Sequence, residues 1–201
     1  MIQTLLNTWA EHFDLPILDW IQANLQSELL DTVMPIITML GDAGIFWIIC
    51  SVILMFIPKT RKIGFGMAIA MALGLLVCNV TLKPLIARIR PYDYQIQVLK
   101  KEWTDFLLAG KLLVETPHDF SFPSGHTIAS FEACTVLMLG NKKLGIPATI
   151  LAIAIAFSRM YLYVHYPTDV IASVILGSLF GIFGWWASNK LSVSLKGKYV
   201  K

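Results

Sequence analysis

The residues best suited to chemistry lie in three short clusters, and the third cluster contains a candidate nucleophile. In the segment SRMYLYVHYPTD, His165 is preceded by Arg159 and followed by Asp169. A carboxylate that accepts a hydrogen bond from one imidazole nitrogen fixes the tautomer, leaves the other nitrogen free to attack, and stabilises the imidazolium. Arg159 would add a contact to a phosphate group. The alternatives for the His165–Asp169 pair are a structural hydrogen bond and one half of a metal site.

The first cluster, KPLIARIRP, supplies cations. Lys83 and Arg90 are separated by about two helical turns, so a continuous helix would project both on one side. Together they would clamp a dianion such as phosphate, with Arg90 pairing in bidentate fashion and Lys83 acting as a point charge. Snorkelling of both side chains at a membrane surface is the alternative. Arg88 is expected at the rim of the site, in contact with a headgroup at the substrate entrance.

The second cluster, FPSGHT, precedes an apolar run and is predicted to begin a helix. Free backbone N–H groups at a helix N-terminus bind anions. Ser124 can donate its hydroxyl, Gly125 lets a ligand approach the backbone, and His126 lies in the same turn as a candidate proton donor. An ordinary helix start, with a capping serine, is the alternative. His118 would either line the entrance or be an exposed loop histidine.

Apolar runs between the clusters predict the elements that hold them. Of the 201 residues, 14% are charged and 56% hydrophobic, whereas soluble domains have about 25% and about 45 to 50%. A bilayer core requires about 17 to 25 mostly apolar helical residues. Five runs are predicted spans, although the first is short: Ala43–Pro58, Ile63–Leu82, Ser124–Gly140, Leu144–Val164 and Thr168–Ser188. A sixth, Leu29–Leu40, could span if it extends back through ILDWIQANLQSE.

The predicted fold class is therefore all-α: a polytopic membrane helical bundle of five or six transmembrane helices, forming a single membrane-embedded domain over residues 1–201. Region 1–42 is expected to be an interfacial segment or the first helix. Region 83–126 would be an outer loop with the first two clusters, and region 158–169 holds the third.

The basic residues predict how this bundle is oriented. Lys and Arg near span ends are retained on the cytoplasmic side. Basic residues follow alternate spans at three places. These are the stretches 58–62 and 141–143 and the C-terminal tail with Lys190, Lys196, Lys198 and Lys201. The three clusters are then extracytoplasmic, where their positive charge requires an anionic partner. The net charge of +3 is small and scattered, which argues against nucleic acid as a partner.

The three clusters together resemble the signature of the type 2 phosphatidic acid phosphatase (PAP2) superfamily, which also includes bacterial acid phosphatases, glucose-6-phosphatase and vanadium haloperoxidases. The motifs K-x6-RP, PSGH and SR-x5-H-x3-D occur in that order between Lys83 and Asp169, and fix eleven residues without a departure. The pattern of spans resembles the integral-membrane lipid phosphatases, which implies a helical core of the PAP2/haloperoxidase type.

The resemblance implies a two-step hydrolysis of a phosphomonoester or diphosphate that needs no metal and no cofactor. By position in the motifs, His165 would become a phosphohistidine, Asp169 would orient it, and His126 would protonate the leaving oxygen and then activate water. The phosphoryl oxygens would be held by the remaining signature positions, which are Lys83, Arg90, Ser124, the Gly125 backbone and Arg159.

Membrane location favours a lipid phosphate as the substrate, with its tail in the bilayer and its headgroup at the cations. Undecaprenyl diphosphate is expected first, followed by phosphatidylglycerol phosphate and phosphatidic acid. The expected location is the cell membrane, of bacterial type, with the active site on the extracytoplasmic face. The alternatives are a lipid phosphotransferase with the same site and a non-enzymatic anion or lipid transporter.

Overall fold

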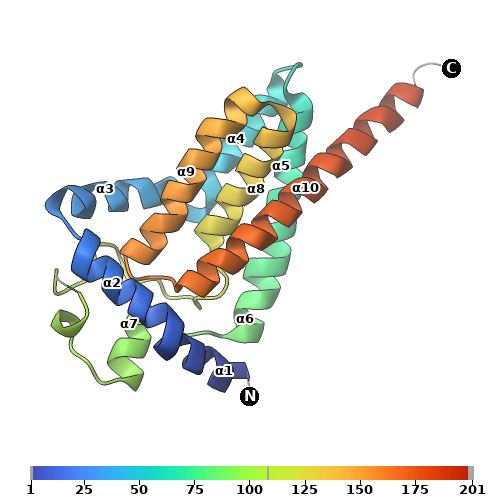
Figure 1. Cartoon of the computed structure of the whole chain (residues 1–201). Helices are drawn as coiled ribbons and strands as arrows, with labels where there is room; N and C mark the ends of the chain where they lie inside the picture. Colours follow the sequence, from blue (N-terminus) through green and yellow to red (C-terminus); the bar gives the residue numbers. More distant parts are fainter. Residues whose placement is uncertain (1, 108, 199–201) are drawn as a thin grey trace.

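The fold is seen in a computed structural model that describes residues 2–107 and 109–198. Every regular element in these two ranges is a helix, which confirms the predicted all-α class. Four helices lie side by side and form the bundle (Figure 1): α5 (Arg61–Gly74), α8 (Gly125–Gly140), α9 (Lys142–Tyr161) and α10 (Pro167–Lys198). The shorter α4 (Ile45–Phe56) packs against α5. Lys201 lies outside the described residues.

The distribution of apolar side chains is that of a protein surrounded by lipid. Inside the bundle, small and apolar residues such as Met67, Ala70, Ala133 and Ala152 are fully buried. Large apolar side chains also cover the outward faces of the helices, as on α4 and α10: Ile45, Ile49, Ile53, Phe56, Ile171, Ile175, Leu179 and Ile182. A helix satisfies its backbone hydrogen bonds internally, so such surfaces are stable in a hydrocarbon environment.

The number of helices able to cross a membrane is smaller than the five or six expected. By length and composition, three stretches within the described residues qualify, namely Arg61–Val98, Lys142–Tyr161 and Pro167–Leu191. A fourth span exists if α3 (Glu28–Met39) and the following Asp42–Phe56, bent by 40°, count as one. The 16-residue α8 is shorter than this requirement and lies between α5, α9 and α10.

The N-terminal region does not form the straight sixth span that the sequence allowed. It contains α1 (Ile2–Trp9), the π-helical η1 (Ala10–Asp14) and α2 (Leu15–Leu25), and the chain then turns at the extended residue Gln26 into α3. The Ser27 hydroxyl caps α3 by accepting from the amide of Leu30 at 3.3 Å. Figure 1 shows α1 and α2 across one end of the bundle, whereas α3 projects from its side. Backward extension of Leu29–Leu40 was therefore wrong.

The segment after α5 brings the first cluster to the same end. The helix continues through η3 (Leu75–Leu82) into α6 (Lys83–Ile86), which ends because Ala87 adopts a left-handed conformation with φ of 48°. The sequence predicted Lys83 and Arg90 two turns apart on one helix. This prediction was wrong, because α6 ends between them. Three short helices follow: α7 (Pro91–Asp93), η4 (Tyr94–Val98) and η5 (Trp103–Asp105). Their aromatic residues pack under α2 with Tyr163 and Tyr166.

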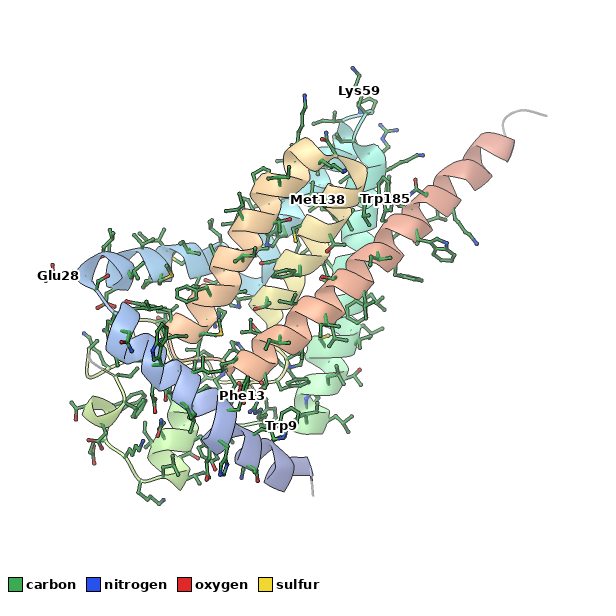
Figure 2. All side chains as sticks on the ribbon, viewed as in Figure 1. Trp9, Phe13, Glu28, Lys59, Met138 and Trp185 are labelled. Carbon is green, nitrogen blue, oxygen red and sulfur yellow. The ribbon has the colours of Figure 1, made fainter. Side chains whose placement is uncertain are left out.

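The opposite end of the bundle carries the basic connections. The turn before α5 contains Lys59, and α9 begins with Lys142 and Lys143. Figure 2 shows Lys59 at the end away from Trp9 and Phe13, which belong to the N-terminal helices. The two ends of the bundle thus differ in both charge and structure.

Candidate active site

A cavity of about 1100 Å³ opens at the end of the bundle where α6, α8 and α9 meet the N-terminal helices. Its wall contains Lys83, Arg90 and Arg159 together with His126 and His165. Three cations and two imidazoles from segments far apart in the sequence therefore face one space. Gly125, the first residue of α8, and the exposed His118 also line it.

The two ring nitrogens of His165 have different partners. Nη1 of Arg90 donates to Nε2 at 3.2 Å and also to the carbonyl oxygen of Val164 at 2.7 Å. A guanidinium can only donate, so this contact requires a lone pair on Nε2 and leaves the ring proton on Nδ1. Nδ1 lies 3.6 Å from Oδ2 of Asp169, too far for a hydrogen bond. The expected His165–Asp169 hydrogen bond is therefore not formed, although the tautomer is the expected one.

The Asp169 carboxylate is held behind His165, out of the cavity. Arg88 donates to Oδ1 at 2.5 Å, while the amide of Tyr166 at 3.0 Å and the Ser121 hydroxyl donate to Oδ2. Because three donors engage a fully buried carboxylate, its position is fixed.

The entrance position expected for Arg88 was wrong. Its side chain is buried and does not line the cavity. Besides Asp169, it donates to Oδ2 of Asp14 at 2.7 Å and to the Thr168 hydroxyl at 2.8 Å, and it lies 3.8 Å from the centre of the Tyr166 ring. Burial of a guanidinium requires such carboxylate partners. Arg88 is thus a link between the N-terminal region and Asp169.

Arg159 and His126 are each supported by the N-terminal region. Nη1 of Arg159 donates to the Thr38 hydroxyl of α3 at 2.5 Å, whereas its buried Nε has no partner within the described residues and is available to an anion. Nε2 of His126 lies 2.7 Å from Oδ1 of Asp42, in the short helix η2 (Asp42–Gly44). A carboxylate at this distance can orient the imidazole and stabilise its charged form.

The structure does not place Ser124, an expected phosphate-binding residue, on the cavity wall. It stands at the N-cap position of α8, but its hydroxyl lies 3.0 Å from that of Thr127 and makes no capping bond. Its amide donates to the Ser173 hydroxyl at 2.8 Å. The residue is fully buried and outside the cavity wall, so the structure does not bring it to the phosphate position.

Asp119 completes the site from the loop before α8. Its carboxylate bridges Lys83 and Arg90, and its carbonyl oxygen accepts from Nε of Arg90 at 2.9 Å. Burial raises the pKa of Asp119, but the hydrogen bond from Lys83 and the charges of Arg90 and Lys83 outweigh it and lower the pKa to about 2. For the buried His165, burial and then the charges of Arg90 and Arg159 lower the pKa well below its usual value. At neutral pH Asp119 is anionic and His165 is neutral.

Three of these carboxylates, Asp14, Asp42 and Asp119, were not found from the sequence. Each lies outside the three clusters, and no spacing relative to a histidine or arginine singles it out. Among the described residues, no group of three or more His, Cys, Asp or Glu side chains is arranged to hold a metal ion.

The signature positions and their geometry agree with a comparison against family models. Residues 61–192 match the model described as PAP2 superfamily. The chain belongs to the PAP2 superfamily. The matched region contains all three clusters of the PAP2 signature, whereas Asp14, Thr38 and Asp42 lie before it.

Similar PAP2 proteins include named lipid phosphatases. An undecaprenyl-diphosphatase of Sulfolobus acidocaldarius is 35% identical over 133 residues, or 66% of this chain and 58% of that protein, so the match spans less than two thirds of its length. A decaprenylphosphoryl-5-phosphoribose phosphatase of Mycobacterium tuberculosis is 30% identical over 70% of this chain and 71% of its own. The crystal structure of a phosphatidylglycerolphosphate phosphatase from Bacillus subtilis superposes with a TM-score of 0.70 and 26% identity, covering 94% of this chain and 91% of that one.

Proposed function

We propose that this PAP2 protein is a membrane lipid phosphatase that hydrolyses a phosphomonoester or diphosphate through a phosphohistidine intermediate. The observation that carries the proposal is the single cavity in which Lys83, Arg90 and Arg159 surround the Nε2 lone pair of His165 and the ring of His126. Phosphoryl transfer needs a nucleophile, a proton donor and cations for the equatorial oxygens. An anion transporter would need only the cations.

In this mechanism, the Arg90 donor turns from Nε2 of His165 to a phosphoryl oxygen, and the freed Nε2 lone pair attacks phosphorus as the bond to the leaving oxygen breaks. Asp169, at 3.6 Å from Nδ1, stabilises the positive charge that develops on the ring. Burial and then the charge of Arg159 lower the pKa of His126 to about 2 in the free protein, and the entering phosphate dianion offsets that charge, so that His126 takes up a proton on binding. With Asp42 behind it, His126 gives this proton to the leaving oxygen. It then removes a proton from the water that attacks the phosphohistidine, so inorganic phosphate leaves and both histidines return to their starting state. These steps need no metal ion.

A lipid substrate is supported by the apolar extension of the cavity. Beyond the cations, its wall passes between Ile48 and Val52 of α4 and Met71 and Leu75 at the end of α5. Ile48, Val52 and Leu75 also belong to the exposed apolar surface, so this part of the cavity is open towards lipid. The phosphate of a lipid can therefore reach the cations while its chain stays between α4 and α5.

Among lipids, we rank undecaprenyl diphosphate first, followed by phosphatidylglycerol phosphate and phosphatidic acid. Among the similar proteins, one is named as an undecaprenyl-diphosphatase, one as a decaprenylphosphoryl-5-phosphoribose phosphatase and one as a phosphatidylglycerolphosphate phosphatase. The site end is extracytoplasmic in this proposal, because the basic connections at Lys59 and Lys142 are at the other end of the bundle.

The test is release of inorganic phosphate by the detergent-purified protein, with EDTA present, from the three lipids and a soluble phosphate ester. His165→Ala should abolish release and the acid-labile phosphoenzyme, while His126→Ala should still bind substrate. His12→Ala, an exposed histidine outside the cavity, is the matched control and should behave as wild type. Normal release by His165→Ala, or loss of activity on chelation, would contradict the mechanism. A phosphorylated acceptor in place of free phosphate would indicate a phosphotransferase.

A further inference from the structure

The position where the phosphate must bind is already contacted by an anionic side chain. The Asp119 carboxylate accepts from Nζ of Lys83 with one oxygen and from Nη2 of Arg90 with the other. Arg90 directs Nε to the Asp119 carbonyl oxygen as well, and its Nη1 is engaged by Val164 and His165. Without displacement of Asp119, Arg90 has no pair of donors to offer a phosphate.

The two cations and the carboxylate differ in how freely they can move. The side chains of Lys83 and Arg90 are 11% and 3% exposed, whereas that of Asp119 is 54% exposed. Asp119 also lies in the loop between η5 and α8, not in a helix. The cations are therefore fixed parts of the wall, and Asp119 is the group that can swing out.

We propose that Asp119 is a specificity-determining residue: an internal carboxylate that every headgroup must displace from Lys83 and Arg90, so that phosphomonoesters and diphosphates enter and the phosphodiester lipids of the bilayer are excluded. The inference rests on the proposed function, because it concerns the headgroup that the same site accepts.

The exclusion follows from charge and from the number of oxygens. A phosphodiester presents one negative charge on two free oxygens, and the Asp119 carboxylate already presents the same to Lys83 and Arg90. Replacement of the carboxylate by a phosphodiester therefore gains little free energy. A phosphomonoester has a charge of about −1.5 to −2 at neutral pH and three free oxygens. Its third oxygen can accept from the unpartnered Nε of Arg159, a contact that Asp119 does not make.

This competition matters because phosphodiester lipids surround the cavity at high local concentration. Asp119 lowers the affinity of the site for all anions by the free energy of its own displacement. A monoanionic ligand then binds too weakly to occupy the site, whereas a dianionic ligand still binds. The same competition favours release of inorganic phosphate after hydrolysis.

Binding of two soluble probes tests the inference without requiring turnover. Methyl phosphate stands for a monoester and dimethyl phosphate for a diester, and calorimetric titration of the detergent-purified full chain gives their Kd values. Wild type should bind methyl phosphate and show no saturable binding of dimethyl phosphate. Asp119→Asn should bind methyl phosphate about tenfold or more tighter and make dimethyl phosphate binding measurable, because the two charge-assisted contacts of the carboxylate no longer have to be broken.

Two further variants separate this role from a structural one. Asp119→Glu keeps the charge and should keep the exclusion of dimethyl phosphate. Glu28→Gln removes an equal charge at the start of α3, outside the cavity, and should bind both probes as wild type does. If Asp119→Asn binds both probes no tighter than wild type, Asp119 does not compete with phosphate and the inference is overturned.

A turnover assay distinguishes failure of this inference from failure of the proposed function. In vesicles with rising phosphatidylglycerol, a phosphodiester, hydrolysis of the lipid substrate by Asp119→Asn should be inhibited while wild type is unaffected. If no lipid is hydrolysed by wild type but the probe affinities shift as stated, the proposed function fails and the inference stands. Hydrolysis with equal tolerance of phosphatidylglycerol in both proteins would overturn the inference alone.

Discussion

His165 combines a buried ring with a lone pair directed at a cation. Burial and the charges of Arg90 and Arg159 disfavour the imidazolium, so the pKa of His165 lies well below its usual value of about 6.5. A histidine whose pKa is lowered stays neutral down to that lower pKa as the pH falls. The nucleophile is therefore not lost by protonation in the range where an ordinary histidine titrates.

We expect the acid limb of kcat/KM to follow the substrate and not His165. Phosphomonoesters take up a proton near pH 6 and lose their second charge. Two soluble monoesters whose second pKa values differ by about one unit should give acid limbs displaced by the same amount. The measurement is a pair of pH–rate profiles on wild-type protein. A limb fixed near pH 6.5 for both esters would mean that His165 titrates normally.

His126 provides the second prediction at this scale. Asp42→Asn removes the carboxylate that lies 2.7 Å from Nε2 of His126. With the charged ring less stabilised, kcat should fall about 10- to 100-fold, and KM should change little, because proton transfer and not phosphate binding is affected. Steady-state kinetics on the preferred lipid give both values. Asp31→Asn, a carboxylate of α3 that accepts from Tyr161 at 2.6 Å outside the cavity, is the control; an equal loss there would contradict the assignment.

The N-terminal helices act as the support of the catalytic elements. Asp14 of η1, Thr38 of α3 and Asp42 of η2 reach Arg88, Arg159 and His126, respectively. Asp14 also accepts from the amide of Thr168 at 2.9 Å, next to Asp169 at the start of α10. The PAP2 signature is thus completed by a part of the chain that precedes the matched region.

Asp14→Asn should destabilise the protein, because it leaves the buried Arg88 with half of its carboxylate partners. Breaking a buried ion pair from one side costs about 3 to 5 kcal/mol of the free energy of unfolding. Thermal unfolding in detergent should show a lower Tm, and kcat should fall as Asp169 loses its fixed position. Glu28→Gln is the control for loss of one charge. An unchanged Tm would mean that the Asp14–Arg88 pair carries no stability.

The sequence was sufficient for the elements that carry local motifs. Gly125–Gly140, Lys142–Tyr161 and the helix from Pro167 follow apolar runs, and the signature lies at their ends. The sequence was insufficient where the position of a side chain depends on contacts with residues far away in the chain. Arg88 looks like a rim residue in KPLIARIRP, but Asp14, 74 positions away, makes burial possible. Nothing local marks Ala87 as the end of a helix, or Asp42 and Asp119 as partners of the site.

The whole molecule is electrically asymmetric along the bundle axis. Basic residues gather in the α4–α5 turn and in the first turns of α5 and α9 at one end, whereas the cavity is at the other: Lys59, Arg61, Lys62, Lys142 and Lys143. Positive connections are usually retained in the cytoplasm, so this asymmetry predicts the orientation proposed above.

Thiol labelling in intact cells tests this orientation. The test uses a background in which Cys50, Cys78 and Cys134 are replaced by Ala. In that background, Glu28→Cys should react with a membrane-impermeant maleimide added outside, and Lys143→Cys should react only after the cells are permeabilised. Retained activity of the cysteine-free protein shows that it is folded. The reverse labelling pattern would put the active site on the cytoplasmic face.

The proposed route of a lipid between α4 and the end of α5 changes the meaning of substrate concentration for this protein. A lipid that enters between Ile48 and Leu75 does not pass through water, so encounter depends on the number of substrate molecules per unit area of bilayer. The search is a two-dimensional diffusion, and its rate is set by membrane fluidity and by the mole fraction of the lipid. A cell can therefore control flux through this site by the composition of the surrounding leaflet, without altering the protein.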